Sequence, residues 1–165
     1  MLTTNSTHPM QPTATTLLAF VRLSKDLCGI NELDLWGTGQ VPAYYRTTAD
    51  AVTEPRLERM FAVHTGLPFD SGRVEAIRSQ LVDDPEFGPI CQRIIILFLL
   101  AEWVALPATW TNLFGASTDE RVGIPTAYAF PEALLWPAVG AHPPGAKPGG
   151  YNSWISAPVS LPMPT

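Results

Sequence analysis

The last third of the chain, residues 122–165, combines few charges with many prolines. It contains only two charged residues, Glu132 and Lys147, but nine of the seventeen prolines. Proline removes a backbone donor and interrupts helices and central strands. The large apolar side chains of this segment would nevertheless each gain roughly 1.5–3 kcal/mol from full burial. The segment therefore needs a surface to lie on, which is either the chain's own helices or a second protein.

Composition limits the classes of partner. The chain has 165 residues, enough for one domain with its own core. Its charged fraction is 15%, against roughly 25% in typical soluble domains, which indicates an unusual amount of buried surface. The net charge is −5 and the ten Lys and Arg residues are scattered. Without a basic stripe, nucleic acid is not an expected partner.

Helical periodicity dominates residues 16–121, and no useful period-2 alternation is present. We expect an all-α fold: a small, irregular helical domain with a flexible N-terminus over residues 1–15. Residues 122–165 would form a long, Pro/Gly-rich and mostly extended C-terminal segment of the same domain. The clearest helices are predicted at 16–28, ended by Gly29, at 55–66, and at 84–106, opened by Asp84 and Pro85. Shorter helices are expected at 31–36, from 42, from 70, and at 131–136.

The most apolar stretch, residues 94–106, is interrupted only by Glu102. Its thirteen residues would span about 20 Å as a helix, too short to cross a membrane. We therefore expect a buried helix and no transmembrane segment, with Glu102 paired to Arg93 or to an arginine of a partner. Cys28 and Cys91 fall in helical segments, which favours reduced core thiols over a disulfide.

The residues that could carry chemistry form no recognisable set. Gly37-Thr38-Gly39 lacks the preceding strand and the third glycine of a nucleotide-binding loop. The three histidines, His8, His64 and His142, have no ligand partners at metal-binding spacing. The pattern indicates no catalytic, cofactor-binding or metal-binding residue in this chain, so we expect it not to be an enzyme on its own.

Three blocks of the chain resemble one known family. They are residues 18–29, residues 84–103, and the C-terminal order of Tyr128, Glu132-Ala133-Leu134-Leu135-Trp136, Gly140, Pro143-Pro144-Gly145, Pro148-Gly149-Gly150-Tyr151, Trp154 and Ala157-Pro158. Together they are similar to the small (gamma) subunit of the FAD-dependent sugar and polyol dehydrogenases, which include sorbitol, fructose and glucose dehydrogenases.

The resemblance implies a non-catalytic subunit that binds and stabilises a large, FAD-containing subunit of the glucose-methanol-choline type and assists its folding. FAD would sit in that partner, which oxidises a sugar, polyol or glycoside and passes electrons to a cytochrome c or another acceptor. Because Ala141 to Gly150 contains no cysteine, association should be non-covalent. Aromatic and proline residues of the C-terminal segment would form the contact. The expected partner-interface residues are Tyr128, Phe130, Trp136, Pro143, Pro144, Tyr151 and Trp154.

Two other readings remain open at this point. The chain would also fit a free-standing helical adaptor or regulatory module that binds an unrelated protein. An enzyme acting through Glu102 or His64 is a further alternative, although His64 is more simply a helix cap. Residues 1–16 show neither a Sec signal nor the twin-arginine pair that is usual in the family. We therefore expect the chain to stay in the cytoplasm or to be exported to the periplasm with its partner.

Overall fold

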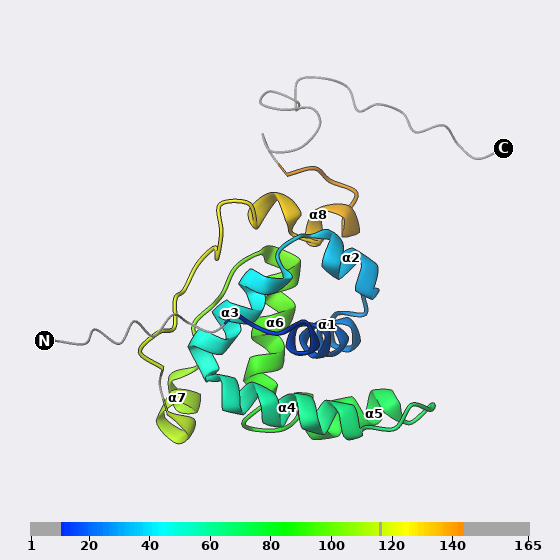
Figure 1. Cartoon of the computed structure of the whole chain (residues 1–165), viewed down its shortest axis with the longest axis vertical. Helices are drawn as coiled ribbons and strands as arrows, with labels where there is room; N and C mark the ends of the chain where they lie inside the picture. The colour runs from blue at the N-terminus through cyan, green and yellow to red at the C-terminus, as the bar shows by residue number, and fades with distance from the viewer. Residues whose placement is uncertain (1–10, 116, 144–165) are drawn as a thin grey trace, which may run out of the picture.

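The structure, a computed structural model, describes residues 11–115 and 117–143 (Figure 1). Over these residues the fold is all-α, as predicted, and contains no strand. The elements are α1 (Ala14–Cys28), α2 (Glu32–Gly37), α3 (Val41–Val52), α4 (Glu54–Gly66), α5 (Arg73–Ile77), a π-helical turn η1 (Arg78–Val82), α6 (Gly88–Leu100), α7 (Ala108–Phe114), a 3-10 turn η2 (Phe130–Glu132) and α8 (Leu135–Ala138).

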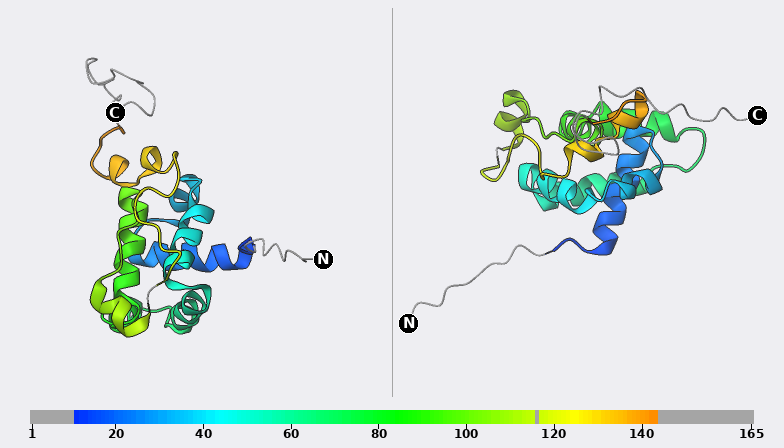
Figure 2. Two further views of the ribbon diagram at one scale, coloured as in Figure 1. Left: turned by 90° about the vertical axis from the view of Figure 1, so that its left-hand side faces the viewer. Right: turned by 90° about the horizontal axis from the view of Figure 1, so that it is seen from above.

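Helix α6 is the centre of the fold. It contacts α1, α3 and η1, and Figures 1 and 2 show it running the length of the helical body with α1 crossing it. Because the helix is apolar on nearly all sides, it has to be covered from several directions. Its buried residues include Ile90, Cys91, Ile94, Leu97 and Phe98.

An aromatic cluster joins α6 to α1 and α3. The Phe98 ring lies 5.0 Å from the Tyr44 ring at 87° and 5.9 Å from the Phe20 ring. Phe20 in turn meets Tyr45 edge-on at 5.8 Å. Such edge-to-face pairs add roughly 0.5–1.5 kcal/mol each beyond area burial. The three long helices are therefore held together by one continuous set of rings.

Arg56 of α4 bonds to two other segments of the chain. Its Nε donates to Glu86 Oε1 at 2.7 Å, and Arg59 pairs with the same carboxylate. The Arg56 guanidinium also donates to the Phe114 carbonyl at 2.7 Å. One half-buried arginine thus links α4, the turn before α6, and the end of α7.

Helix α6 is shorter than predicted at both ends. Asp84 does cap a turn, because its Oδ1 accepts from the Glu86 and Phe87 amides at 2.8 Å. The α-helix nevertheless begins only at Gly88, which packs against the Val82 carbonyl at the end of η1. At the other end Ala101 adopts the left-handed conformation, with φ 58°. The predicted continuation to residue 106 is therefore wrong.

The residues after α6 form an extended crossing instead of helix. Trp103 pairs with Gly123 through two backbone hydrogen bonds of 2.9 Å, an isolated antiparallel bridge. Glu102 is exposed, so the expectation of a buried carboxylate paired with Arg93 is also wrong. Arg93 donates to the Ala105 carbonyl at 2.9 Å. The chain turns here because its backbone finds a tertiary partner that the local sequence does not show.

Residues 122–143 lie on the chain's own helices. The Leu134 amide donates to the Phe98 carbonyl at 3.0 Å, and Ala129 and Ala133 are buried. This hydrogen bond places a non-helical residue, Ala133, between η2 and α8. The helix predicted over 131–136 is thus divided in two, and Pro137 lies inside α8 instead of ending a helix. The extended path expected beyond Gly140 falls mostly outside the described residues.

Both cysteines are free thiols. Burial raises the pKa of Cys28 and of Cys91 to about 12. A thiol with so high a pKa is almost entirely protonated at neutral pH and therefore a poor nucleophile.

Gly88 offers a test of how tightly α6 is seated. A Cβ at this position would lie 2.3 Å from the Val82 carbonyl oxygen, so Gly88→Ala forces backbone to move. We expect it to lower the free energy of unfolding by about 1–3 kcal/mol in urea denaturation followed by circular dichroism.

The matched control is Gly66→Ala at the last position of α4, where a Cβ would meet nothing within 4 Å. That variant should be neutral or more stable by about 0.4–1 kcal/mol. Equal stability of the two variants would contradict the close approach at Gly88.

Candidate functional site

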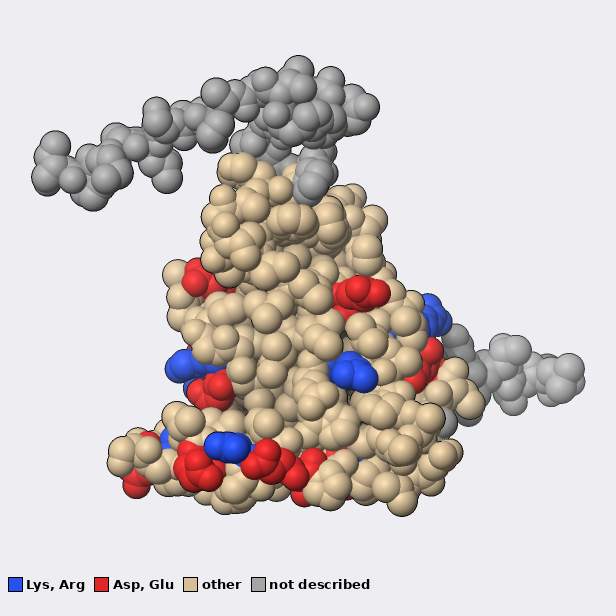
Figure 3. Space-filling view, turned by 180° about the vertical axis from the view of Figure 1, so that it is seen from behind, with Lys and Arg blue, Asp and Glu red and all other residues tan. Residues whose placement is uncertain are grey.

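One end of the molecule is poor in charge. It is formed by α2, the C-terminal end of α6, and residues 128–143, and we call it the apolar end. Residues 133–143 contain no Asp, Glu, Lys or Arg. Figure 3 shows the charged side chains of one face lying mainly over the rest of the molecule. The apolar end itself carries Glu32 and Asp34 on α2 and Glu132 on η2, but no Lys or Arg. Charge depletion of this kind is typical of the core of a protein interface.

Large apolar side chains are exposed on the apolar end. Tyr128 is 77% exposed and Leu33 of α2 is 80% exposed. Single exposed apolar residues are common on protein surfaces, but contiguous sets of them mark interaction sites. The others on this end are more than a third exposed: Trp36, Leu100, Phe130 and Val139.

Phe130 and Trp136 form a rigid pair within the apolar end. Their rings meet edge-on at 5.3 Å and 78°. The Trp136 indole nitrogen donates to the Phe130 carbonyl at 2.9 Å, and Trp136 packs partly against the core. The pair therefore presents aromatic surface in a fixed orientation, which lowers the entropy lost when a partner binds.

The sequence-predicted interface residues divide into three groups. Tyr128 and Phe130 are exposed, whereas Trp136 is half-buried and Pro143 is buried on the chain itself. Pro144, Tyr151 and Trp154 lie outside the described residues. Their role as partner contacts stays a prediction. Sequence reasoning missed Leu33 and Trp36, which lie on a short helix with only one buried residue, Leu35.

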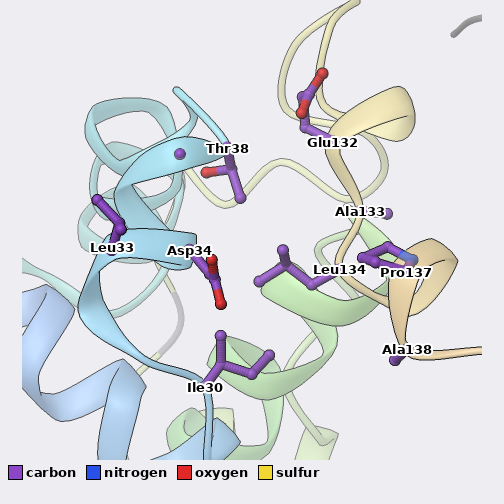
Figure 4. A pocket seen from close by; sticks show the side chains of 10 residues that line it. Ile30, Leu33, Asp34, Thr38, Glu132, Ala133, Leu134, Pro137 and Ala138 are labelled. Carbon is purple, nitrogen blue, oxygen red and sulfur yellow. The ribbon is translucent and has the colours of Figure 1, made fainter. Parts of the chain in front are cut away.

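A groove divides the apolar end between α2 and the η2–α8 segment (Figure 4). It has a volume of ≈ 660 Å³. Ile30, Leu33 and Leu134 supply apolar lining. The Asp34 carboxylate lies near Ile30 and Leu134, whereas the Glu132 carboxylate is turned away from them. The groove can accommodate a small apolar segment. The remaining lining residues are Gly37, Thr38, Ala133, Pro137 and Ala138.

A second cluster, far from the apolar end, surrounds His64. Its Nε2 lies 2.7 Å from Asp26 Oδ2 and 3.0 Å from Arg73 Nη2. Arg73 reaches Asp26 Oδ2 at 2.6 Å and also donates to the Pro68 carbonyl at 3.1 Å. The three side chains come from α1, α4 and α5, so the cluster fastens these elements together. His64 is thus engaged by Asp26 and Arg73 rather than acting only as the helix cap expected from the sequence.

Residues 11–115 and 117–143 contain no group of three or more His, Cys, Asp or Glu side chains arranged to hold a metal ion. None of the helices in those ranges has the length and hydropathy of a membrane-spanning helix.

No protein-family model matches this chain, and comparisons with curated proteins and with solved structures gave no match.

The Asp26 cluster predicts a pH dependence of stability. Burial by itself would raise the pKa of Asp26, but hydrogen bonds and charge interactions with His64 and Arg73 outweigh it, so the pKa is lowered from 3.8. A carboxyl whose pKa is lower in the folded state stabilises the fold above its unfolded pKa. That stabilisation is lost as the pH falls through the folded pKa, below about pH 4.

We expect the unfolding free energy of Asp26→Asn to fall less steeply than that of the wild type in this acidic range, measured by urea denaturation at several pH values. Asp70→Asn, which changes an exposed carboxylate outside the cluster, is the control and should follow the wild type. Parallel acid profiles for Asp26→Asn and the wild type would contradict a lowered pKa at Asp26.

Proposed function

We propose that this chain is the non-catalytic small subunit of an FAD-dependent dehydrogenase that oxidises a sugar, polyol or glycoside. It binds the large FAD-containing subunit, of the glucose-methanol-choline type, and supports its folding. The redox chemistry and the flavin belong to that partner, which passes electrons to a cytochrome c or another acceptor. The resemblance of residues 18–29, 84–103 and 128–158 to the family suggests this identity.

The observation that supports the proposal is the exposure of large apolar and aromatic side chains on the apolar end. Tyr128 and Leu33 are mostly exposed, and the Phe130–Trp136 pair at the same end is held in a fixed orientation. Obligate interfaces are large and apolar, and aromatic side chains dominate their energetics. The sequence beyond Pro143 contains two further aromatic residues, Tyr151 and Trp154.

The helical body has a complete core of its own, which also suits a free-standing adaptor. Phe20, Tyr44 and Trp103 are fully buried without any second chain. An adaptor would bind a protein unrelated to flavin chemistry. The two proposals therefore differ in the partner, and the partner's spectrum separates them.

Co-expression tests the proposal directly. We expect the chain to co-purify with a flavoprotein of the glucose-methanol-choline type encoded beside it, giving a yellow complex with the visible spectrum of bound FAD. The flavoprotein expressed alone should be recovered in lower amount or with less flavin. Recovery of the chain free of flavoprotein, with a fully active large subunit in its absence, would refute the proposal.

Tyr128→Ala locates the interface within that complex. Because the ring is 77% exposed, its loss should change the stability of the free chain by no more than about 0.5 kcal/mol. Affinity for the flavoprotein should fall by about tenfold or more, as for a hot-spot aromatic. Val74→Ala removes a side chain that is 78% exposed on α5, at the opposite end of the molecule, and should bind as the wild type does.

Removal of residues 144–165 tests the contribution of the C-terminal segment. Pro143 is buried and the Ala141 amide donates to the Trp136 carbonyl at 2.9 Å, so a chain ending at Pro143 keeps its described contacts. We expect an unchanged helical signal in circular dichroism but weaker retention of the flavoprotein. Loss of the helical signal would assign the segment to the chain's own core instead.

A further inference from the structure

A second group of exposed apolar side chains lies beside the bridge between Trp103 and Gly123. Val122 is 63% exposed, Ile124 is 55% exposed and Val104 is 37% exposed. Because the bridge is antiparallel, it places Val104 next to Val122 on the neighbouring segment. We call Val104, Val122 and Ile124 the bridge flank. A contiguous set of exposed apolar residues marks an interaction surface more often than a single one does.

The bridge flank continues into the apolar end along one stretch of chain. Residues 117–129 run up one side of the helical body, from beside α7 to η2 (Figures 1 and 2). Only three residues separate Ile124 from Tyr128, which is exposed on the apolar end. The surface that we assign to a partner at the apolar end therefore extends down this side of the molecule.

The chain holds the bridge flank in place by itself. Glu120 Oε1 accepts from the Trp103 indole nitrogen at 2.9 Å and from the Leu106 amide at 3.1 Å. Thr126 Oγ1 donates to Gln40 Oε1 of the turn before α3 at 2.7 Å. A surface fixed in this way loses little entropy when a partner binds.

Glu102 gives the bridge flank a charge that its own chain does not balance. Its side chain is exposed and forms no hydrogen bond or ion pair with any of residues 11–115 and 117–143. Arg93, one of its expected partners, donates to the Ala105 carbonyl instead. A carboxylate just beyond α6 is also unfavourable, because the C-terminal end of a helix is itself partly negative. A locally unfavourable, unpaired charge of this kind suits a cation on another protein.

We propose that the partner that covers the apolar end also covers the bridge flank, with an apolar surface and an arginine or lysine opposite Glu102. The identity of this partner, the large FAD-containing subunit, rests on the proposed function. Burial of Val104, Val122 and Ile124 contributes affinity, and the ion pair of Glu102 orients the complex.

Charge favours a basic partner surface over a second copy of the chain. The apolar end contains acidic residues but no Lys or Arg, so one basic surface suits both the apolar end and Glu102. A second copy carries a net charge of −5 and is repelled as a whole.

Val122→Ser tests the apolar part of the contact. We expect the affinity of the purified chain for the flavoprotein to fall by about tenfold or more in biolayer interferometry. The matched control is Val74→Ser, which changes a valine that is 78% exposed on α5 and should bind as the wild type does. Because both side chains are exposed, neither change should alter the urea midpoint of the free chain.

Charge variants test the ion pair. Glu102→Lys should weaken binding by about tenfold or more, and high salt should weaken binding of the wild type more than that of Glu102→Gln. Glu75→Lys, at an exposed position on α5, should bind as the wild type does. In the free chain, Glu102→Gln should be at least as resistant to urea as the wild type. A loss of stability in Glu102→Gln would instead assign this carboxylate to the chain's own fold.

Tyr128→Ala, measured beside these variants, separates the inference from the proposed function. Normal binding by Val122→Ser and Glu102→Lys, with weak binding by Tyr128→Ala, would confine the contact to the apolar end and refute the extension alone. If the chain binds no flavoprotein, the proposed function fails and the flavoprotein is refuted as the occupant of the bridge flank. Dimerisation of the free wild-type chain that Val122→Ser abolishes, in analytical ultracentrifugation, would assign the bridge flank to a second copy.

Discussion

The fold depends on covering α6, a helix whose only charged or strongly polar side chains are Gln92 and Arg93. Its flanks are covered by α1, α3 and η1, and its end is closed by the Leu134 amide on the Phe98 carbonyl. Phe98 thus contributes its ring to the aromatic cluster and its carbonyl to the C-terminal segment. A helix end needs partners for its last carbonyls, and here a residue 36 positions later in the sequence supplies one. That single bond brings residues 128–143 to the apolar end and shapes the groove.

The helices with local signals were predicted closely. Gly29 ends α1 in the left-handed conformation, and Pro55 opens α4, as the residue types indicated. The errors occurred where tertiary contacts decide. No residue type near Ala101 signals the end of a helix in the sequence. The helix ends there because Trp103 pairs with Gly123, twenty residues away. Likewise, η2 and α8 are separated because Leu134 bonds to α6, a contact that local propensity cannot express.

The candidate site was predictable in kind but only partly in position. Low charge and frequent aromatic residues indicated that residues 122–165 need a covering surface. The burial of Ala129 and Ala133 shows that the chain's own helices provide part of that surface. Tyr128, by contrast, remains in solvent. The side of α2 that carries Leu33 could not be found from the sequence, since a helix of six residues is too short for periodicity to separate its buried face from its exposed face.

The charged residues of the apolar end are all of one sign. Helix α2 and residues 128–143 contain Glu32, Asp34 and Glu132 and neither Lys nor Arg, so they carry three of the five net negative charges of the chain. Two copies of the chain therefore repel each other when these ends meet, whereas a basic surface is attracted to this end before contact.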